Sequence, residues 1–135
     1  MDVTQIPFVK YIGIKKDGQT LKLEASDTVQ NHMQTIHASA QFTLAETQSG
    51  LLLQRIFPEL EGKVLAVLRG STVKYKNPAI STIYATASIE KDMKEKFLNQ
   101  LERKRRATIV IGVQVLDEEE ILTMQGNFTW FVQKI

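Results

Sequence analysis

The chain has 135 residues, 43% hydrophobic and 24% charged, which is typical of one globular domain and disfavours a disordered chain. It contains no cysteine, which excludes disulfides and thiolate metal sites, and its net charge of +2 is too small to indicate a nucleic-acid partner by itself. No secretory signal and no apolar run of the roughly 20 residues needed for a membrane span is visible, so the sequence favours a cytoplasmic protein that binds neither nucleic acid nor a membrane.

The N-terminal part predicts a β-hairpin. Residues 8–15 are rich in aromatic and β-branched side chains, the pair Asp17-Gly18 favours a tight turn, and residues 21–25 alternate between apolar and polar. Residues 26–36 are polar and irregular, which predicts a loop.

The strongest helix signal lies at residues 38–55, which contain many good helix formers and no proline. Apolar residues such as Phe42, Leu44, Leu51 and Leu52 lie on all sides of this segment. A helix that is apolar all round is normally buried all round, so we expect a central helix that other elements must cover.

The rest of the chain predicts strands joined by links too short for parallel crossovers, apart from one charged amphipathic helix. An antiparallel sheet packed on one helix satisfies this order of elements, which is an α+β arrangement. A single flat sheet cannot cover a helix on every side, so either strong sheet curvature or a second subunit is expected. The predicted strands span residues 63–75, 81–89, 107–116 and 121–132, and the predicted second helix spans residues 91–106.

Glu46 is the main candidate for a functional group. It lies in the third turn of the predicted central helix and shares a stripe with Phe42 and Gly50. A carboxylate on an otherwise apolar helix is costly unless it is paired, bound to a ligand or solvated by a cleft. A structural salt bridge, an exposed flank of the helix or a functional acid each fits this pattern.

Polar groups at the start of the same helix are the second candidate. His37 either caps the first helical turn or acts as a donor or acid–base group, and Asn31 is either a turn residue or an amide that orients substrate or water. The backbone amides of Ala38 and Ser39 lack helical partners and lie at the positive end of the helix dipole. They are therefore suited to hold an oxyanion or a carbonyl oxygen.

The spacing Asn31-x5-His37-Ala38-Ser39-x6-Glu46 resembles that of hot-dog-fold acyl-CoA thioesterases of the phenylacetyl-CoA type, which carry Asn-x5-His-Gly-Gly-x6-Asp or Glu. The segment 75–79, Tyr-Lys-Asn-Pro-Ala, is similar to the aromatic-x-x-Pro-Ala motif of that family, and the order of elements agrees over nearly the whole chain. The resemblance implies a single hot-dog domain over residues 1–135, in which a curved antiparallel sheet wraps around a long central helix. It also implies a homodimer or a homotetramer built as a dimer of dimers.

The resemblance further implies thioester hydrolysis, with an acyl-CoA as substrate and neither a cofactor nor a metal. Glu46 would activate water or attack the thioester carbonyl, and the Ala38 and Ser39 amides would hold the oxyanion. His37 and Asn31 would orient the carbonyl and the water. In such folds the site lies at a dimer interface, so Glu46 of one subunit would face the loop of its partner.

Two further groups of residues are assigned to the substrate. An acyl tunnel beside the helix would be lined by Phe42, Leu53 and Leu68. The phosphates of coenzyme A would contact Lys74, Lys76, Arg105 and Arg106, because basic side chains suit phosphates, although a solvated charged face explains the same residues.

Two alternatives stay open. The first is a non-catalytic hot-dog protein that binds acyl-CoA or a fatty acyl chain, because Ala38 and Ser39 stand where the family has two glycines and narrow the approach to the amides. The second is a relative of the 3-hydroxyacyl dehydratases, which would use a histidine with an acidic residue.

Overall fold

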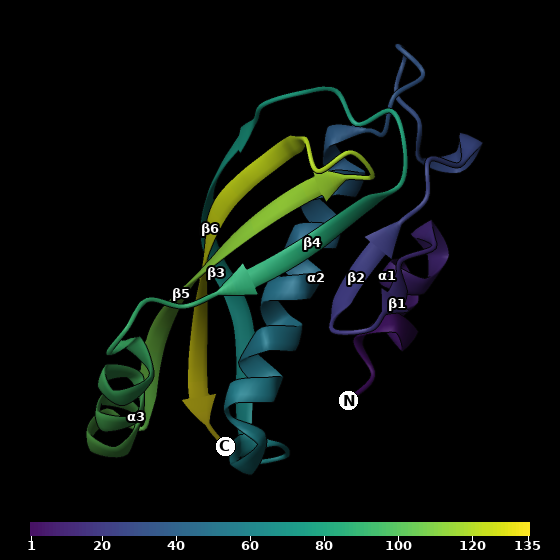
Figure 1. Ribbon diagram of the computed structural model, residues 1–135. Helices are drawn as coiled ribbons and strands as arrows, with labels where there is room; N and C mark the ends of the chain where they lie inside the picture. The colour runs from purple at the N-terminus through teal and green to yellow at the C-terminus, as the bar shows by residue number, and fades with distance from the viewer.

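A computed structural model describes all residues, 1–135, and contains one six-stranded antiparallel sheet curled around a central helix, as predicted (Figure 1). The strands lie in the order β1-β2-β4-β5-β6-β3, and every pair of neighbours is antiparallel. None of the helices combines the length and apolarity needed to cross a membrane. The helices are α1 (Pro7–Ile12), α2 (Ala38–Ile56) and α3 (Met93–Lys104), the strands are β1 (Lys15–Asp17), β2 (Thr20–Leu23), β3 (Val64–Tyr75), β4 (Ile83–Ser88), β5 (Arg106–Asp117) and β6 (Leu122–Lys134), and short 3-10 turns lie at Val3–Gln5, Asp27–Val29 and Pro58–Leu60.

The inner face of the sheet forms the core with α2. Along β5 the side chains alternate between exposed and buried, so that Ile109, Ile111 and Val113 point inward while Thr108 and Val110 point to solvent. The helix packs against β2, β4 and β5, and α3 covers the beginning of β5 with Phe97 and Leu101 (Figure 1). The outer face of the sheet carries no covering layer of its own chain.

The expectation that α2 is apolar all round is wrong, because its buried side includes polar residues. Hydroxyl groups account for most of them: Thr43 donates to the Ser39 carbonyl, and Ser49 donates to the Glu46 carbonyl. Gln48 accepts a hydrogen bond from the backbone N–H of Leu21 in β2 at 2.8 Å. These bonds offset the desolvation cost of the groups that make them, whereas the buried Gln41 Oε1 has no hydrogen-bond partner.

One flank of α2 is left partly open. Phe42, Glu46 and Gly50 are half-buried, and they lie on the side of the helix that faces β6 and the edge strand β3. β3 itself is exposed along most of its length, with 66% of Leu65 and 56% of Val67 accessible to solvent. The sheet of one chain therefore curls around α2 without closing over it.

The prediction of a strand at residues 8–15 is wrong. Residues 7–12 form helix α1, and only the short strand β1 pairs with β2 to make the hairpin. Pro7 stands at the first helical position and Gly13 ends the helix in the left-handed conformation, with φ of 89°. These two local signals outweigh the β propensity of the side chains between them.

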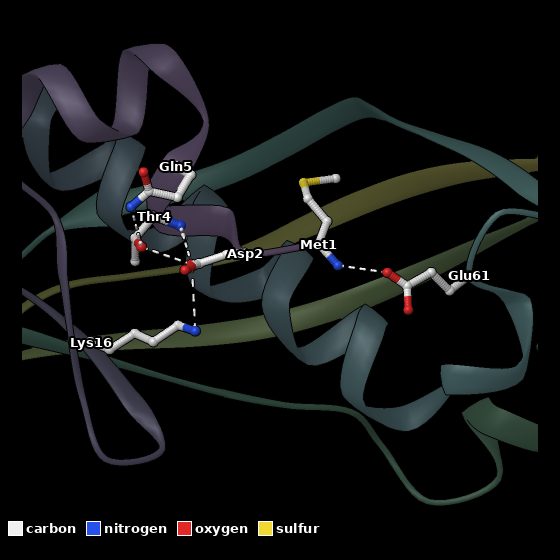
Figure 2. Close-up of polar contacts among 6 residues, drawn as sticks. All are labelled: Met1, Asp2, Thr4, Gln5, Lys16 and Glu61. Carbon is white, nitrogen blue, oxygen red and sulfur yellow. Dashed lines mark hydrogen bonds and ion pairs between the residues drawn. The ribbon is translucent and has the colours of Figure 1, made fainter.

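The segment before α1 is held by polar contacts at the surface. Asp2 accepts hydrogen bonds from the backbone and hydroxyl of Thr4 and lies 3.4 Å from the Lys16 ammonium, and the Met1 ammonium lies 2.6 Å from the Glu61 carboxylate (Figure 2). The second of these contacts joins the N-terminal segment to the loop that follows α2.

Candidate active site

Glu46 is a half-buried carboxylate without a partner. It lies on the open flank of α2, and no hydrogen bond or ion pair is made by its side-chain oxygens. Burial raises the pKa of Glu46 above its ordinary value, because partial removal from water disfavours the charged form. The salt-bridge interpretation of Glu46 is therefore wrong, and the carboxylate is free to meet a ligand or a second chain.

The wall beside Glu46 is aromatic. Trp130 of β6 donates from Nε1 to the Ser49 hydroxyl at 2.8 Å, and the indole lies 3.3 Å from the position that a Cβ atom at Gly50 would occupy. One helical turn before Glu46, the Phe42 ring packs on Phe128 with centroids 5.4 Å apart. From the sequence Trp130 could only be assigned to the core or an interface, because its contact with α2 joins residues 81 positions apart.

His37 caps α2. Its Nδ1 accepts a hydrogen bond from the Ser39 backbone N–H at 2.9 Å, and the ring is exposed. Because Nδ1 is the acceptor, the neutral ring carries its proton on Nε2. The capping role leaves the Nε2–H free to donate to a substrate carbonyl.

Only one of the two expected backbone donors is free. The Ser39 N–H is used by His37, which corrects the expectation that this amide holds an oxyanion. The Ala38 N–H has no partner within the chain. The Tyr75 hydroxyl donates to the Ala38 carbonyl at 3.1 Å, and burial raises the Tyr75 pKa. This bond joins the end of β3 to the start of α2, and it was not visible in the sequence.

Asn31 holds the loop that precedes α2. Its side-chain oxygen accepts hydrogen bonds from the backbone N–H groups of Met33 and Thr35, and its amide donates to the Thr35 hydroxyl at 2.9 Å. These bonds support the interpretation of Asn31 as a turn residue, and a direct contact of Asn31 with substrate or water stays a prediction.

The structure does not bring Glu46 and His37 together in one chain. Glu46 follows Ala38 by eight residues on one helix, which separates them by roughly 12 Å along the helix axis. A single carbonyl group therefore cannot contact both Glu46 and the start of α2 in the same chain. No group of three or more His, Asp or Glu side chains is placed to hold a metal ion.

The expected acyl tunnel is not one cavity. Leu53 lines a cavity of about 470 Å³ at the C-terminal end of α2, whereas Phe42 and Leu68 do not line it. Leu68 is half-buried in β3 opposite Trp130, and Phe42 lies near the other end of the helix. Of the three residues expected to line an acyl tunnel, only Leu53 therefore lines this cavity.

The four basic residues assigned to coenzyme A do not form one cluster. Lys74 pairs with Gln125 near the end of β3, whereas Arg106 pairs with Gln133 at the opposite end of the sheet. Lys74 also lines a polar hollow of about 710 Å³ on the outer face, away from α2. Within one chain these residues therefore form two separate groups, Lys74 with Lys76 and Arg105 with Arg106, and their contact with the phosphates stays a prediction.

The comparisons with known proteins place this geometry in a family. A family model described as a domain of unknown function, DUF4442, matches residues 7–132. Among curated proteins none matches the chain.

Several solved structures share the architecture. A protein of unknown function from Pseudomonas aeruginosa, described as a probable thioesterase, is 18% identical over 98% of this chain and 91% of its own, with a TM-score of 0.83. A Bacillus halodurans protein solved with CoA is 23% identical over 93% of this chain and 74% of its own, with a TM-score of 0.73. A thioesterase from Haemophilus influenzae is 17% identical over 98% and 86%, with a TM-score of 0.76. At these identities the likeness shows the fold, and it confirms the hot-dog fold predicted from the sequence.

Proposed function

The chain belongs to the DUF4442 family over residues 7–132, and from its hot-dog fold and its site we propose that it is an acyl-CoA thioesterase that uses Glu46. The single observation that carries this proposal is the unpartnered, half-buried carboxylate on the open flank of α2. The structural neighbours described as thioesterases, and the one solved with CoA, support the substrate class.

Glu46 acts on water in this proposal. Its raised pKa makes it a stronger base than an exposed glutamate, so it takes a proton from a water molecule as the water oxygen attacks the thioester carbon. The C–S bond then breaks, and the proton held by Glu46 passes to the departing coenzyme A thiolate. Direct attack by the carboxylate, followed by hydrolysis of the anhydride, gives the same products.

The carbonyl oxygen is held at the start of α2. The free Ala38 N–H and the His37 Nε2–H are the two donors, and the positive end of the helix dipole adds to their effect. Asn31 is a positioning residue here, because it fixes the loop that presents His37.

A second chain completes the site. The donors at His37 and Ala38 lie roughly 12 Å along the helix from Glu46, so we propose that Glu46 of one chain faces the donors of another. The open flank of α2 and the exposed strand β3 are the surfaces available for such a homodimer. Assembly of two dimers into a tetramer stays a prediction.

The phosphates of coenzyme A are placed at Lys74 and Lys76. These residues flank Tyr75, whose hydroxyl contacts the start of α2, whereas Arg105 and Arg106 lie at the far end of the sheet. Binding through exposed lysines weakens as salt screens the charges, and salt-insensitive binding of coenzyme A would remove both lysines from the proposal.

The test is release of free thiol from a panel of acyl-CoAs. General acid–base assistance is worth roughly 10²–10⁴-fold, so Glu46→Ala and Glu46→Gln are expected to lower kcat by a factor in that range. The matched control is Glu24→Gln, which removes an exposed carboxylate without a partner and keeps native activity. Full activity of Glu46→Ala would exclude Glu46 from the mechanism.

The Ser39 amide favours a second candidate function. With that N–H bound to His37, one backbone donor remains, which is consistent with a protein that binds acyl-CoA without hydrolysing it. Tight binding of an S-alkyl-coenzyme A thioether, with no thiol release from any acyl-CoA, would establish this alternative. Hydration of enoyl-CoA would instead establish the dehydratase alternative.

A further inference from the structure

The cavity of about 470 Å³ lies between the C-terminal end of α2 and the beginning of β3. Its volume falls in the range of small-molecule sites, about 300–1,000 Å³. Phe57 and Phe97 pack against each other in its wall with centroids 4.7 Å apart. Its lining is mostly hydrophobic, and its polar members include Gln54 and Glu61, whose carboxylate pairs with the Met1 ammonium (Figure 2). The cavity has the form of a site for an apolar group.

A strip of apolar surface leads from Glu46 to this cavity. Glu46, Gly50 and Leu53 follow one another on the same flank of α2, and Leu53 lines the cavity. Opposite Gly50 stands Trp130, which is half-buried and packs against the helix.

The residues of β3 and β6 that face this strip also run from beside Glu46 to the cavity. Trp130 pairs with Leu68 across β6 and β3, and the next inward-facing pair, Val132 with Ala66, lines the cavity. Both sides of the strip therefore run from the carboxylate to the cavity without an intervening charged residue.

We propose that this cavity receives the end of a medium-length apolar acyl chain whose thioester lies at Glu46. The inference rests on the proposed function, because Glu46 marks where the thioester lies. Gly50 and the half-buried Trp130 form the floor over which the chain passes, and the buried pair Phe57 and Phe97 in the cavity wall limits its length.

The distance along α2 determines which acyl groups reach the cavity. Leu53 follows Glu46 by seven residues, or roughly 10 Å along the helix axis. An acetyl group ends close to Glu46, whereas a decanoyl chain extends to the cavity. Each methylene that leaves water for an apolar site strengthens binding roughly fourfold, so affinity is expected to rise steeply with chain length.

The test compares two enlargements in neighbouring parts of the sheet. Ala66→Phe in β3 places a ring in the cavity, whereas the control Val110→Phe in β5 places the same ring on the outer face of the sheet, away from β3. Ala66→Leu is a smaller filling in case the phenylalanine disturbs folding, which thermal unfolding and molar mass in solution report. The probes are S-ethyl- and S-decyl-coenzyme A thioethers, titrated calorimetrically, because they bind without being hydrolysed.

The native protein and Val110→Phe are expected to bind the S-decyl thioether at least about a hundredfold more tightly than the S-ethyl thioether. Ala66→Phe is expected to lose at least about tenfold of that preference, Ala66→Leu less, and both are expected to keep native affinity for the S-ethyl thioether. No preference in the native protein, or equal losses in Ala66→Phe and Val110→Phe, would overturn the inference. If the preference follows the expectation while no acyl-CoA is hydrolysed, the proposed hydrolysis fails and the binding site stands. If acyl-CoAs of every length are hydrolysed equally well, the proposed function stands and the inference fails.

Discussion

At the scale of single residues, the burial that suits Glu46 to act as a base also lowers the stability of the folded protein. A carboxylate that has lost part of its hydration and has gained no partner favours its protonated form, which is the property that makes it a useful base. The same property destabilises the folded protein wherever the group is ionised. Glu46 is therefore expected to make a pH-dependent contribution to the free energy of unfolding.

The direction of that contribution follows from linkage. Because the folded pKa lies above the ordinary value of 4.5, the folded state binds the proton more tightly than the unfolded state, and this contribution is lost as pH rises through the raised pKa. Glu46→Gln keeps the shape and removes the ionisation. We expect this variant to match the native protein at about pH 4 and to become more stable than it toward about pH 8, as measured by urea unfolding. Glu24→Gln should show no such trend. If the native protein instead became more stable than Glu46→Gln as pH rises, the result would contradict the raised pKa of Glu46.

His37 combines a structural role with a proposed chemical one, and substitutions can separate them. His37→Ala removes the acceptor for the Ser39 N–H and is expected to cost about 1 kcal/mol of stability, the usual value of a helix cap. His37→Ser restores a preferred cap but cannot extend a donor to the carbonyl. We expect His37→Ser to be nearly as stable as the native protein while its kcat falls roughly 10²–10³-fold, the loss typical of one oxyanion donor. Native turnover in His37→Ser would leave the ring with the capping role alone.

Sequence reasoning at this scale located groups but not their partners. The pattern singled out Glu46 and His37, because a carboxylate on an apolar helix and a ring before its first turn are both unusual. It could not assign the Ser39 N–H to His37, since the competing interpretations differ only in side-chain geometry. It also missed the bond from Tyr75 to Ala38, which joins residues 37 positions apart.

At the scale of elements, two glycines in the sheet illustrate how β3 is held. A Cβ at Gly126 of β6 would lie 2.6 Å from the Val73 side chain and 2.7 Å from the Thr72 carbonyl, whereas a Cβ at Gly112 of β5 would meet nothing closer than 3.5 Å. The absence of a side chain at Gly126 therefore permits the close approach of β3.

Gly126→Ala is expected to lower the free energy of unfolding by about 1–3 kcal/mol, because backbone and a branched side chain must both move. Hydrogen exchange should show the loss concentrated in the amides of β3. Gly112→Ala is the matched control, expected to be neutral or to stabilise by up to about 1 kcal/mol, since alanine restricts the unfolded chain more than glycine does. Similar effects of the two substitutions would show that the approach of β3 does not depend on Gly126.

The elements that the sequence predicted best are those with long periodic patterns. The predicted helix at 38–55 and strand at 107–116 differ by one residue at their ends from α2 and β5, because burial repeats over many residues in both. The segment 8–15 failed because it is short, so that one proline and one glycine at its ends decided its conformation. The cavity was also beyond prediction, because its walls come from α2, α3, β3 and β6 at once.

At the scale of the whole molecule, the fold leaves a helix flank and a strand without cover. The exposed residues of β3 and the half-buried flank of α2 lie beside one another, and the catalytic groups proposed here are too far apart to serve one carbonyl within a chain. A two-fold homodimer answers both observations, since each flank then meets its own copy and each site draws on two chains.

Subunit exchange tests whether the site is shared between chains. Glu46→Ala and His37→Ser are each expected to be nearly inactive as homodimers. If each site combines Glu46 of one subunit with His37 of the other, a mixed dimer carries one intact site and one doubly substituted site. Statistical exchange makes half of the dimers mixed, so unfolding and refolding an equimolar mixture should restore about a quarter of native thiol release. If both residues instead served a site within one chain, every site in the mixture would lack one group and no activity would return. The two arrangements thus differ by a measurable gain, because complementation requires that the catalytic groups come from different chains.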